Sequence, residues 1–131
     1  MWPIPKLGSM NRLIPSLAYA ISKAEGYGVS GAIPTRANNP GDIELGDIGF
    51  GTLGVGITIY PTLEQGIEAL YRELNLIFTG SSHVYSMFMT FDQMARIWTG
   101  DDKSLDWASI VAKYLNVLPD ITLANWVLNH A

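Results

Sequence analysis

The sequence has no cysteine, which excludes disulfide bonds and thiolate metal sites. This absence does not distinguish an oxidising compartment from a reducing one. Charge is also sparse, because charged residues make up only 15% of the chain and the formal net charge is −4. The 8 Lys and Arg residues are scattered along the sequence and form no cluster. Broad binding to nucleic acid or to an anionic membrane surface is therefore disfavoured, since both require concentrated positive charge.

Long apolar runs are missing as well, since no segment stays apolar for the roughly 18 residues of a membrane span. The N-terminus also lacks the basic start and the apolar run of a secretory signal. Gly8-Ser9-Met10 resembles an engineered junction, so we expect residues 1–9 to be a flexible N-terminal extension. We expect residues 10–131 to form a single domain, because a chain of 131 residues with 48% hydrophobic content supports one core.

Apolar residues recur at helical spacing in five segments. The pattern predicts helices over residues 11–25 and 62–80, a short helix after Thr90, and two further helices that begin at Ser104 and Thr122. The predicted inward face of the Ser104 helix consists of Trp107, Ile110, Val111, Tyr114 and Leu115.

Two of these helices carry a start signal in the sequence. Thr62 with Gln65, and Thr90 with Gln93, have the spacing of a capping box, in which two side chains bond each other's backbone N–H groups. We therefore expect both helices to begin directly after the threonine.

Residues 26–61 differ from the rest because Gly and Pro recur throughout, which predicts loops and short strands and no helix. The expected strand is 56–60, which is β-branched and aromatic, and its partner is either 42–47 or 48–53. The predicted fold class is α+β, mainly α.

Glu25 is the residue that suggests chemistry. It lies on the same helical line as Ala18 and Ile21, so its carboxylate leaves the helix on the buried side. Burial and the negative end of the helix dipole both disfavour its ionised form and raise its pKa, which suits a general acid. The alternative interpretation is an ordinary boundary carboxylate that reaches solvent or pairs with Lys23 or Arg36.

Two segments carry a resemblance to a known family. Ala24-Glu25-Gly26-Tyr27-Gly28, followed by Pro34-Thr35-Arg36-Ala37-Asn38-Asn39-Pro40-Gly41-Asp42-Ile43, resembles the signature of phage and bacterial peptidoglycan-cleaving domains of the lysozyme-like superfamily. Residues 59–67 and 98–101 resemble later landmarks of the same proteins. The resemblance implies a lysozyme-like fold, with a helical lobe and a small β-hairpin lobe flanking a cleft. It also implies that Glu25 is the catalytic acid and that the target is the β-1,4 bond between N-acetylmuramic acid and N-acetylglucosamine.

The resemblance favours a lytic transglycosylase, which needs one acid/base because the sugar's own hydroxyl attacks the anomeric carbon. A hydrolase would need a second carboxylate about 5 to 9.5 Å away. The candidates for that second carboxylate are Asp42, Glu44 and Asp47, although an Asp beside glycine in a loop is also a common turn former. A third possibility is a non-catalytic glycan-binding or structural module of a phage particle or secretion machine.

Further substrate contacts are expected from Asn38, Asn39, Asp42, Tyr60 and Tyr114. The two asparagines would present amides to N-acetyl groups, or they would shape the turn that follows them. Tyr60 would hold a sugar ring or bond the catalytic acid, or it would pack inside the lobe. Tyr27, Trp98, Trp107 and Trp126 would either stack on sugar or pack in the core, and for the three tryptophans, which fall on helical core stripes, we expect packing.

No metal or cofactor is expected. His83 and His130 lie outside the spacing of a metal site or a catalytic triad, and the glycines of 51–56 lack the Lys-Ser/Thr of a phosphate-binding loop. The expected partner of the chain, taken as a monomer, is the glycan strand of peptidoglycan. Action at the cell wall would place it in the periplasm or require delivery by a phage.

Overall fold

The computed structural model describes residues 12–43, 52–53, 56–100 and 104–130. Helices dominate, which confirms the mainly α class. The elements in chain order are α1 (Leu13–Ala24), α2 (Ile33–Arg36), β1 (Thr52–Leu53), β2 (Ile57–Thr58), α3 (Leu63–Phe78), α4 (Phe91–Thr99), α5 (Ser104–Leu115) and α6 (Leu123–His130).

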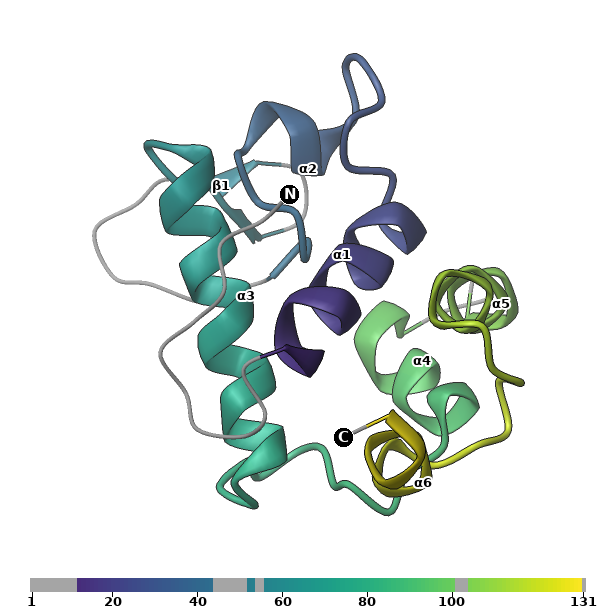
Figure 1. The fold of residues 1–131 in the computed structure, drawn as a ribbon. Helices are drawn as coiled ribbons and strands as arrows, with labels where there is room; N and C mark the ends of the chain where they lie inside the picture. Colours follow the sequence, from purple (N-terminus) through teal and green to yellow (C-terminus); the bar gives the residue numbers. More distant parts are fainter. Residues whose placement is uncertain (1–11, 44–51, 54–55, 101–103, 131) are drawn as a thin grey trace.

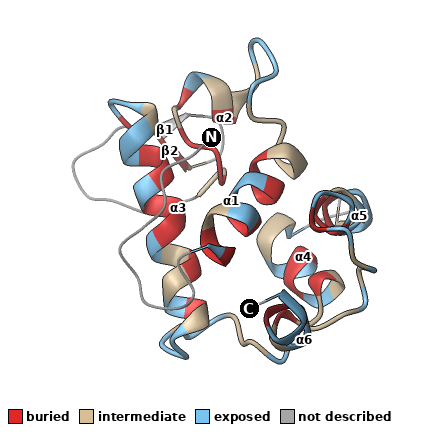
Figure 2. Ribbon diagram, viewed as in Figure 1, coloured by how far each residue is buried: buried red, intermediate tan, exposed pale blue. Residues whose placement is uncertain are grey.

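Helix α1 lies at the centre of the molecule (Figure 1). It packs against α3 on one side and against α5 on the other, while α4 packs against α5. The short elements α2 and β1 gather at one end of the molecule, and α6 lies at the opposite end. Buried faces of the long helices turn towards this common interior (Figure 2). The largest fully buried side chains there include Ile14, Leu17, Ile21, Leu70, Leu74, Ile77, Met94, Trp107 and Trp126.

The apolar stripe of α1 is buried as predicted. Ile14, Leu17, Ala18 and Ile21 are all fully buried, and burial of each large aliphatic side chain contributes about 1.5–3 kcal/mol. Pro15 lies in the first turn, where its missing N–H removes no intrahelical hydrogen bond. The sequence pattern therefore located this helix and its inward face.

The predicted helix starts are confirmed. Thr90 and Gln93 form a complete capping box at the start of α4, which ends at Gly100 in the left-handed conformation, φ 66°. At the start of α3, the Thr62 side chain accepts a 3.2 Å hydrogen bond from the Gln65 backbone N–H. The Gln65 side chain itself lies 3.2 Å from the Thr62 hydroxyl.

The prediction that residues 26–61 contain no helix is wrong at α2. Pro34 occupies the first turn of α2, where its fixed φ favours a helix. The turn is closed by hydrogen bonds from the Arg36 N–H to the Ala32 carbonyl, 3.0 Å, and from the Ala37 N–H to the Ile33 carbonyl, 2.9 Å. One helical turn of this kind is too short to produce the apolar periodicity that sequence analysis detects.

The hairpin is shorter than predicted. β1 and β2 are antiparallel and pair Thr52 with Thr58 and Leu53 with Ile57, so the second of the two proposed partner segments is the named strand. The Thr58 N–H also donates to the carbonyl of Ile43, which belongs to the first proposed segment, at 3.1 Å. The remainder of that segment, residues 44–47, lies outside the described residues.

One predicted core position is wrong. Of the five residues expected inside α5, Tyr114 is 51% exposed and instead contacts the ring of Tyr19 edge-on at 5.9 Å. Tyr114 lies at the margin of a wide helical stripe, where a phenol can keep its polar end in water. Ser104 is the first residue of α5, so the capping position before it falls outside the described residues.

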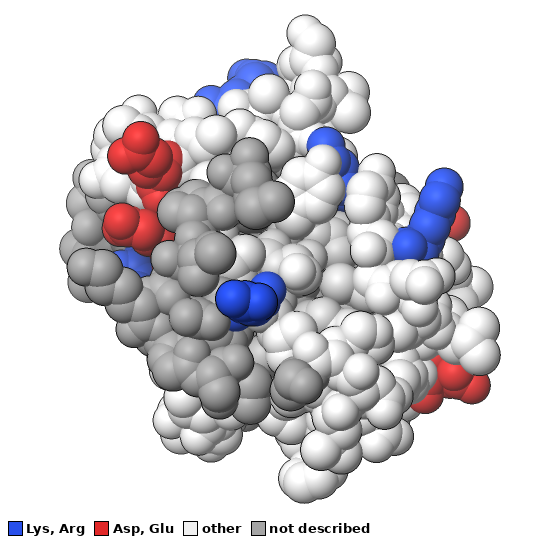
Figure 3. Space-filling view, viewed as in Figure 1, with Lys and Arg blue, Asp and Glu red and all other residues white. Residues whose placement is uncertain are grey.

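The charged groups show the scatter expected from the sequence. On the face drawn in Figure 3, the Lys and Arg side chains are separated by uncharged surface. Within the described ranges, no helix is both long enough and apolar enough to cross a membrane.

Candidate functional site

Glu25 lines an open cavity of about 500 Å³, which we call the Glu25 cavity. Glu25 is the C-cap residue of α1, and its N–H donates to the Ile21 carbonyl at 2.9 Å, so the end of the helix fixes its position. The side chain is half-buried. The cavity wall comes from the end of α1, the loop after α2, the end of α4 and the first turns of α5, and its residues are Lys23, Ala24, Glu25, Gly26, Asp42, Trp98, Thr99, Asp106, Trp107 and Ile110.

Asp42 lines the same cavity as Glu25. It has a positive φ of 53°, which a short polar side chain tolerates, and its Oδ1 atom is buried. Of the three carboxylates predicted as a second catalytic group, Glu44 and Asp47 lie outside the described residues. Asp42 is thus the predicted second carboxylate that the described structure brings to Glu25.

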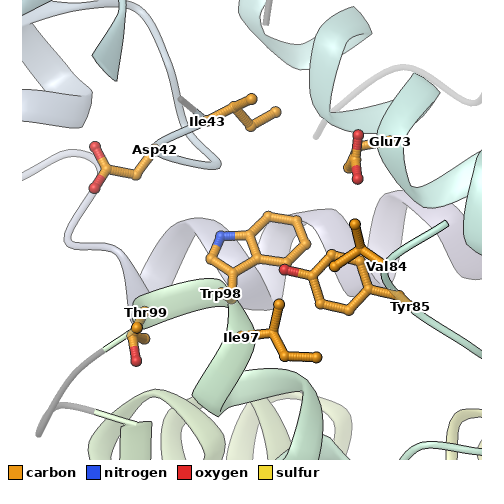
Figure 4. A pocket seen from close by; sticks show the side chains of 9 residues that line it. Asp42, Ile43, Glu73, Val84, Tyr85, Ile97, Trp98 and Thr99 are labelled. Atoms are coloured by element: carbon orange, nitrogen blue, oxygen red, sulfur yellow. The ribbon is translucent and has the colours of Figure 1, made fainter. Parts of the chain in front are cut away.

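A second cavity of about 450 Å³ adjoins the first, because Asp42, Trp98 and Thr99 line both. Figure 4 shows it with Glu73 of α3 on the side opposite Asp42, and with the Trp98 and Tyr85 rings between them. A third cavity of about 430 Å³ continues along α3. We call the first two cavities together the cleft.

The cleft is acidic. Among the described residues that line it, four are carboxylates (Glu25, Asp42, Glu73 and Asp106) and Lys23 is basic. Such a surface does not favour an anionic ligand such as phosphate.

The Tyr85 phenol is influenced by the charges of two of these carboxylates, Glu73 and Glu25. Burial raises the pKa of the Tyr85 phenol, and the negative charges of Glu73 and Glu25 raise it further. The phenol therefore stays protonated at neutral pH and remains a hydrogen-bond donor inside the cleft. Sequence analysis missed Tyr85, Glu73 and Asp106, because none of them belongs to a motif and their proximity depends on the packing of three separate segments.

Trp98 forms the wall shared by both cavities. Its indole N–H donates a 2.9 Å hydrogen bond to the Gly41 carbonyl. Its ring centroid lies 5.5 Å from that of Tyr85 and 5.7 Å from that of Trp107, both in tilted contacts. Trp107 is 2% exposed and supports the Trp98 ring from the core, whereas the half-buried Trp98 ring itself faces both cavities.

The two predicted asparagines are used inside the loop. Asn39 is fully buried; its amide donates to the carbonyls of Ile43, 2.9 Å, and Thr58, 2.8 Å, and accepts from the Ile43 N–H, 3.0 Å. The Asn38 amide donates to the Tyr60 carbonyl at 3.1 Å, with φ 51°. These hydrogen bonds are those expected from the turn-forming interpretation, and they hold the loop that carries Asp42.

Tyr60 and Tyr114 do not line the Glu25 cavity. Tyr60 is 1% exposed, its N–H donates to the Ala37 carbonyl at 2.8 Å, and it borders the third cavity, which agrees with packing inside the lobe. Tyr114 lies on the outer surface beside Tyr19 and borders none of the three cavities. Trp107 and Trp126 are core residues, as expected.

In the part of the chain that the structure describes, no three His, Cys, Asp or Glu side chains are grouped so as to hold a metal ion. In comparisons with protein-family models, curated proteins and solved structures, no match to this chain was found.

Proposed function

We propose that this chain is a peptidoglycan lytic transglycosylase or muramidase that cleaves the β-1,4 bond between N-acetylmuramic acid and N-acetylglucosamine. In this proposal its helices and hairpin form the two lobes of a lysozyme-like fold. The glycan strand of the cell wall lies in the cleft, and Glu25 is the general acid/base.

One observation carries the proposal: Glu25, at the end of α1, opens into a cavity walled by Trp98 and Trp107 and shared with Asp42. A half-buried carboxyl that shares an open cavity with a second carboxylate is the arrangement that glycoside cleavage requires of its general acid. An open groove beside it has room for an extended polymer rather than a small enclosed ligand.

The chemistry requires Glu25 to act twice. Protonated Glu25 gives its proton to the glycosidic oxygen as the bond from C1 of the muramic residue to that oxygen breaks. The resulting carboxylate then accepts the proton of the C6 hydroxyl of the same muramic residue while that oxygen bonds to C1. The products are a 1,6-anhydro end and a free hydroxyl on the leaving sugar, and Glu25 regains its proton.

A hydrolase is the second candidate, favoured by the presence of Asp42 in the same cavity. In that case Asp42 activates water or stabilises the developing positive charge, and water replaces the C6 hydroxyl as the nucleophile. The product is then a reducing end, heavier than the anhydro product by one water.

Mass spectrometry of the products from purified peptidoglycan tests both candidates. We expect wild type to release anhydromuropeptides, and Glu25→Gln to fold but lose at least about 100-fold in rate, as expected for loss of a general acid. Glu68→Gln, an exposed carboxylate of α3 that borders none of the three cavities, is the matched control and should cleave normally.

Three results would change the proposal. Reducing ends together with loss of activity in Asp42→Asn would favour the hydrolase. Activity that survives in Glu25→Gln would refute the assignment of Glu25. Retention on insoluble peptidoglycan with no released fragments would indicate a non-catalytic glycan-binding module.

A further inference from the structure

We infer that Trp98 is a positioning residue, whose indole N–H holds the Gly41–Asp42 segment so that Asp42 faces Glu25 across the cavity. This inference rests on the proposed function and assigns to Trp98 a role in it that is separate from contact with the sugar.

The hydrogen bond is the first support. The Trp98 N–H lies 2.9 Å from the Gly41 carbonyl oxygen, and the next residue along the chain is Asp42. Trp98 and Asp42 line both halves of the cleft, and Figure 4 shows the indole nitrogen turned towards the Asp42–Ile43 segment. A shift of the indole would therefore move the segment that carries the second carboxylate of the site.

The opposite side of Gly41 is closed. A Cβ built on Gly41 would meet the Leu70 side chain at 2.8 Å, so the backbone here is pressed against α3. Asn39 fixes the preceding turn through its buried amide. The loop is thus held between α3 and α4, and the Trp98 hydrogen bond couples it to α4.

The indole is itself fixed by its neighbours. Tyr85 and Trp107 contact its ring at 5.5 Å and 5.7 Å, and α4, which carries Trp98, packs against α5. Glu25 is placed by α1, and α1 packs on α5. The positions of Glu25 and Asp42 therefore both depend on contacts with α5, directly through α1 for Glu25 and through Trp98 of α4 for Asp42. Reacting groups need rigid supporting residues, because a small displacement of a reacting group lowers the rate by a large factor.

Two variants test the role of the N–H. Trp98→Phe keeps an aromatic ring and removes the donor. Substitution of Trp98 by benzothienylalanine, which has sulfur in place of N–H, keeps the bicyclic shape and removes the donor alone. Trp126→Phe is the matched control, because Trp126 is equally a helical tryptophan, is 2% exposed, and borders none of the three cavities.

Two readouts are measured for each variant. Steady-state cleavage of soluble glycan strands should show kcat lowered on the order of 10- to 100-fold in both Trp98 variants. KM should change by less than about threefold if ground-state binding is intact. Carboxyl carbon NMR should show that the titration midpoints of Glu25 and Asp42 both move in the Trp98 variants and stay in place in Trp126→Phe.

The outcomes separate this inference from the proposed function. If the Trp98 variants match Trp126→Phe in kcat, KM and carboxyl titration, Trp98 only packs and the inference is overturned. If wild type cleaves nothing, the proposed function fails, and the NMR titration alone decides. Moved midpoints then support the positioning role, and unmoved midpoints refute it. If Trp98→Phe does not fold, the benzothienylalanine variant gives the same decision.

Discussion

The indole N–H of Trp98 and the carbonyl of Gly41 are joined by a 2.9 Å hydrogen bond. This contact ties the end of α4 to the loop that follows α2, two segments that are far apart in the sequence. It places the aromatic wall of the cleft directly beside Asp42, and through the shared cavity beside Glu25. The candidate site therefore depends on contacts between distant segments of the chain as much as on Glu25.

Gly66 is expected to be irreplaceable, because a Cβ at this position of α3 would overlap the carbonyl oxygen of Asn38. We expect Gly66→Ala to lower the free energy of unfolding by about 3 kcal/mol, as for an overpacked core. Urea denaturation measures this change. Glu68→Ala, exposed on the same helix, should stay within about 0.5 kcal/mol of wild type. Equal unfolding energies for the two variants would contradict the close approach of the loop to α3.

Asn39 is expected to stabilise the loop rather than to bind substrate. Asn39→Ala removes the partner of the buried Thr58 carbonyl and of the partly buried carbonyl and N–H of Ile43, and we expect a loss of about 3 kcal/mol in the free energy of unfolding. Asn125→Ala, at an exposed position of α6, serves as the control in the same denaturation series. If Asn39→Ala unfolds like wild type but loses substrate affinity, the amide acts on the glycan instead.

The capping box of Thr90 and Gln93 is expected to stabilise α4. Thr90→Ala should cost about 1 kcal/mol, the usual value for a lost N-cap side chain. Because Thr90 and Gln93 bond each other's backbone, the double variant should cost less than the sum of the two single variants. Thermal unfolding of all four proteins completes the cycle, and strict additivity would show that the two bonds are independent.

The free energy of unfolding should fall in alkali because of two phenols, the buried Tyr71 and the partly buried Tyr85. Burial raises the pKa of Tyr71 from 10.0 to about 12, and burial with the charges of Glu73 and Glu25 raises that of Tyr85. At a pH above the ordinary pKa of 10.0 but below the raised pKa of the folded protein, the phenols ionise in the unfolded chain and keep their protons in the folded one. The stabilisation is thus complete below about pH 10 and is lost as pH rises through the folded pKa values.

Urea denaturation between about pH 9 and 12 measures the slope of that loss. Tyr71→Phe and Tyr85→Phe should each make the fall in unfolding free energy less steep, and the double variant should flatten it further. The same proteins compared at pH 6 to 8, where neither phenol titrates, provide the control. A slope that is unchanged in both variants would show that the alkaline transition has another origin.

The helices could be predicted from local information. The period of α1, the Thr90–Gln93 pair and the glycines after α1 are signals within one turn of the chain, and the structure follows them. The same period predicts the position of Glu25 at the end of α1, on the side of the helix that faces the interior.

For residues 26–61 the sequence predicts an irregular segment with short strands but not the details of its structure. The single turn of α2 is shorter than the period that reveals a helix. The β-branched and aromatic residues of 56–60 indicate a strand but do not identify its partner, which in the structure is β1 (Thr52–Leu53). The spacing of α5 predicts Tyr114 in the core, yet Tyr114 is exposed, because spacing marks the middle of a helical face reliably but not its margin.

The sequence by itself determined the class of fold, the ends of the main helices and the residue type at the centre of the candidate site, since those depend on neighbours a few positions apart. Only the tertiary structure decided which groups share a cavity with Glu25. It brought Asp42, Trp98 and Trp107 to one cavity and Glu73 and Tyr85 to the adjoining one, and it turned the Asn39 amide inward. The physical reason is that such neighbours are set by how α1, α3, α4 and α5 pack, and no local pattern records the distance between segments that are far apart along the chain.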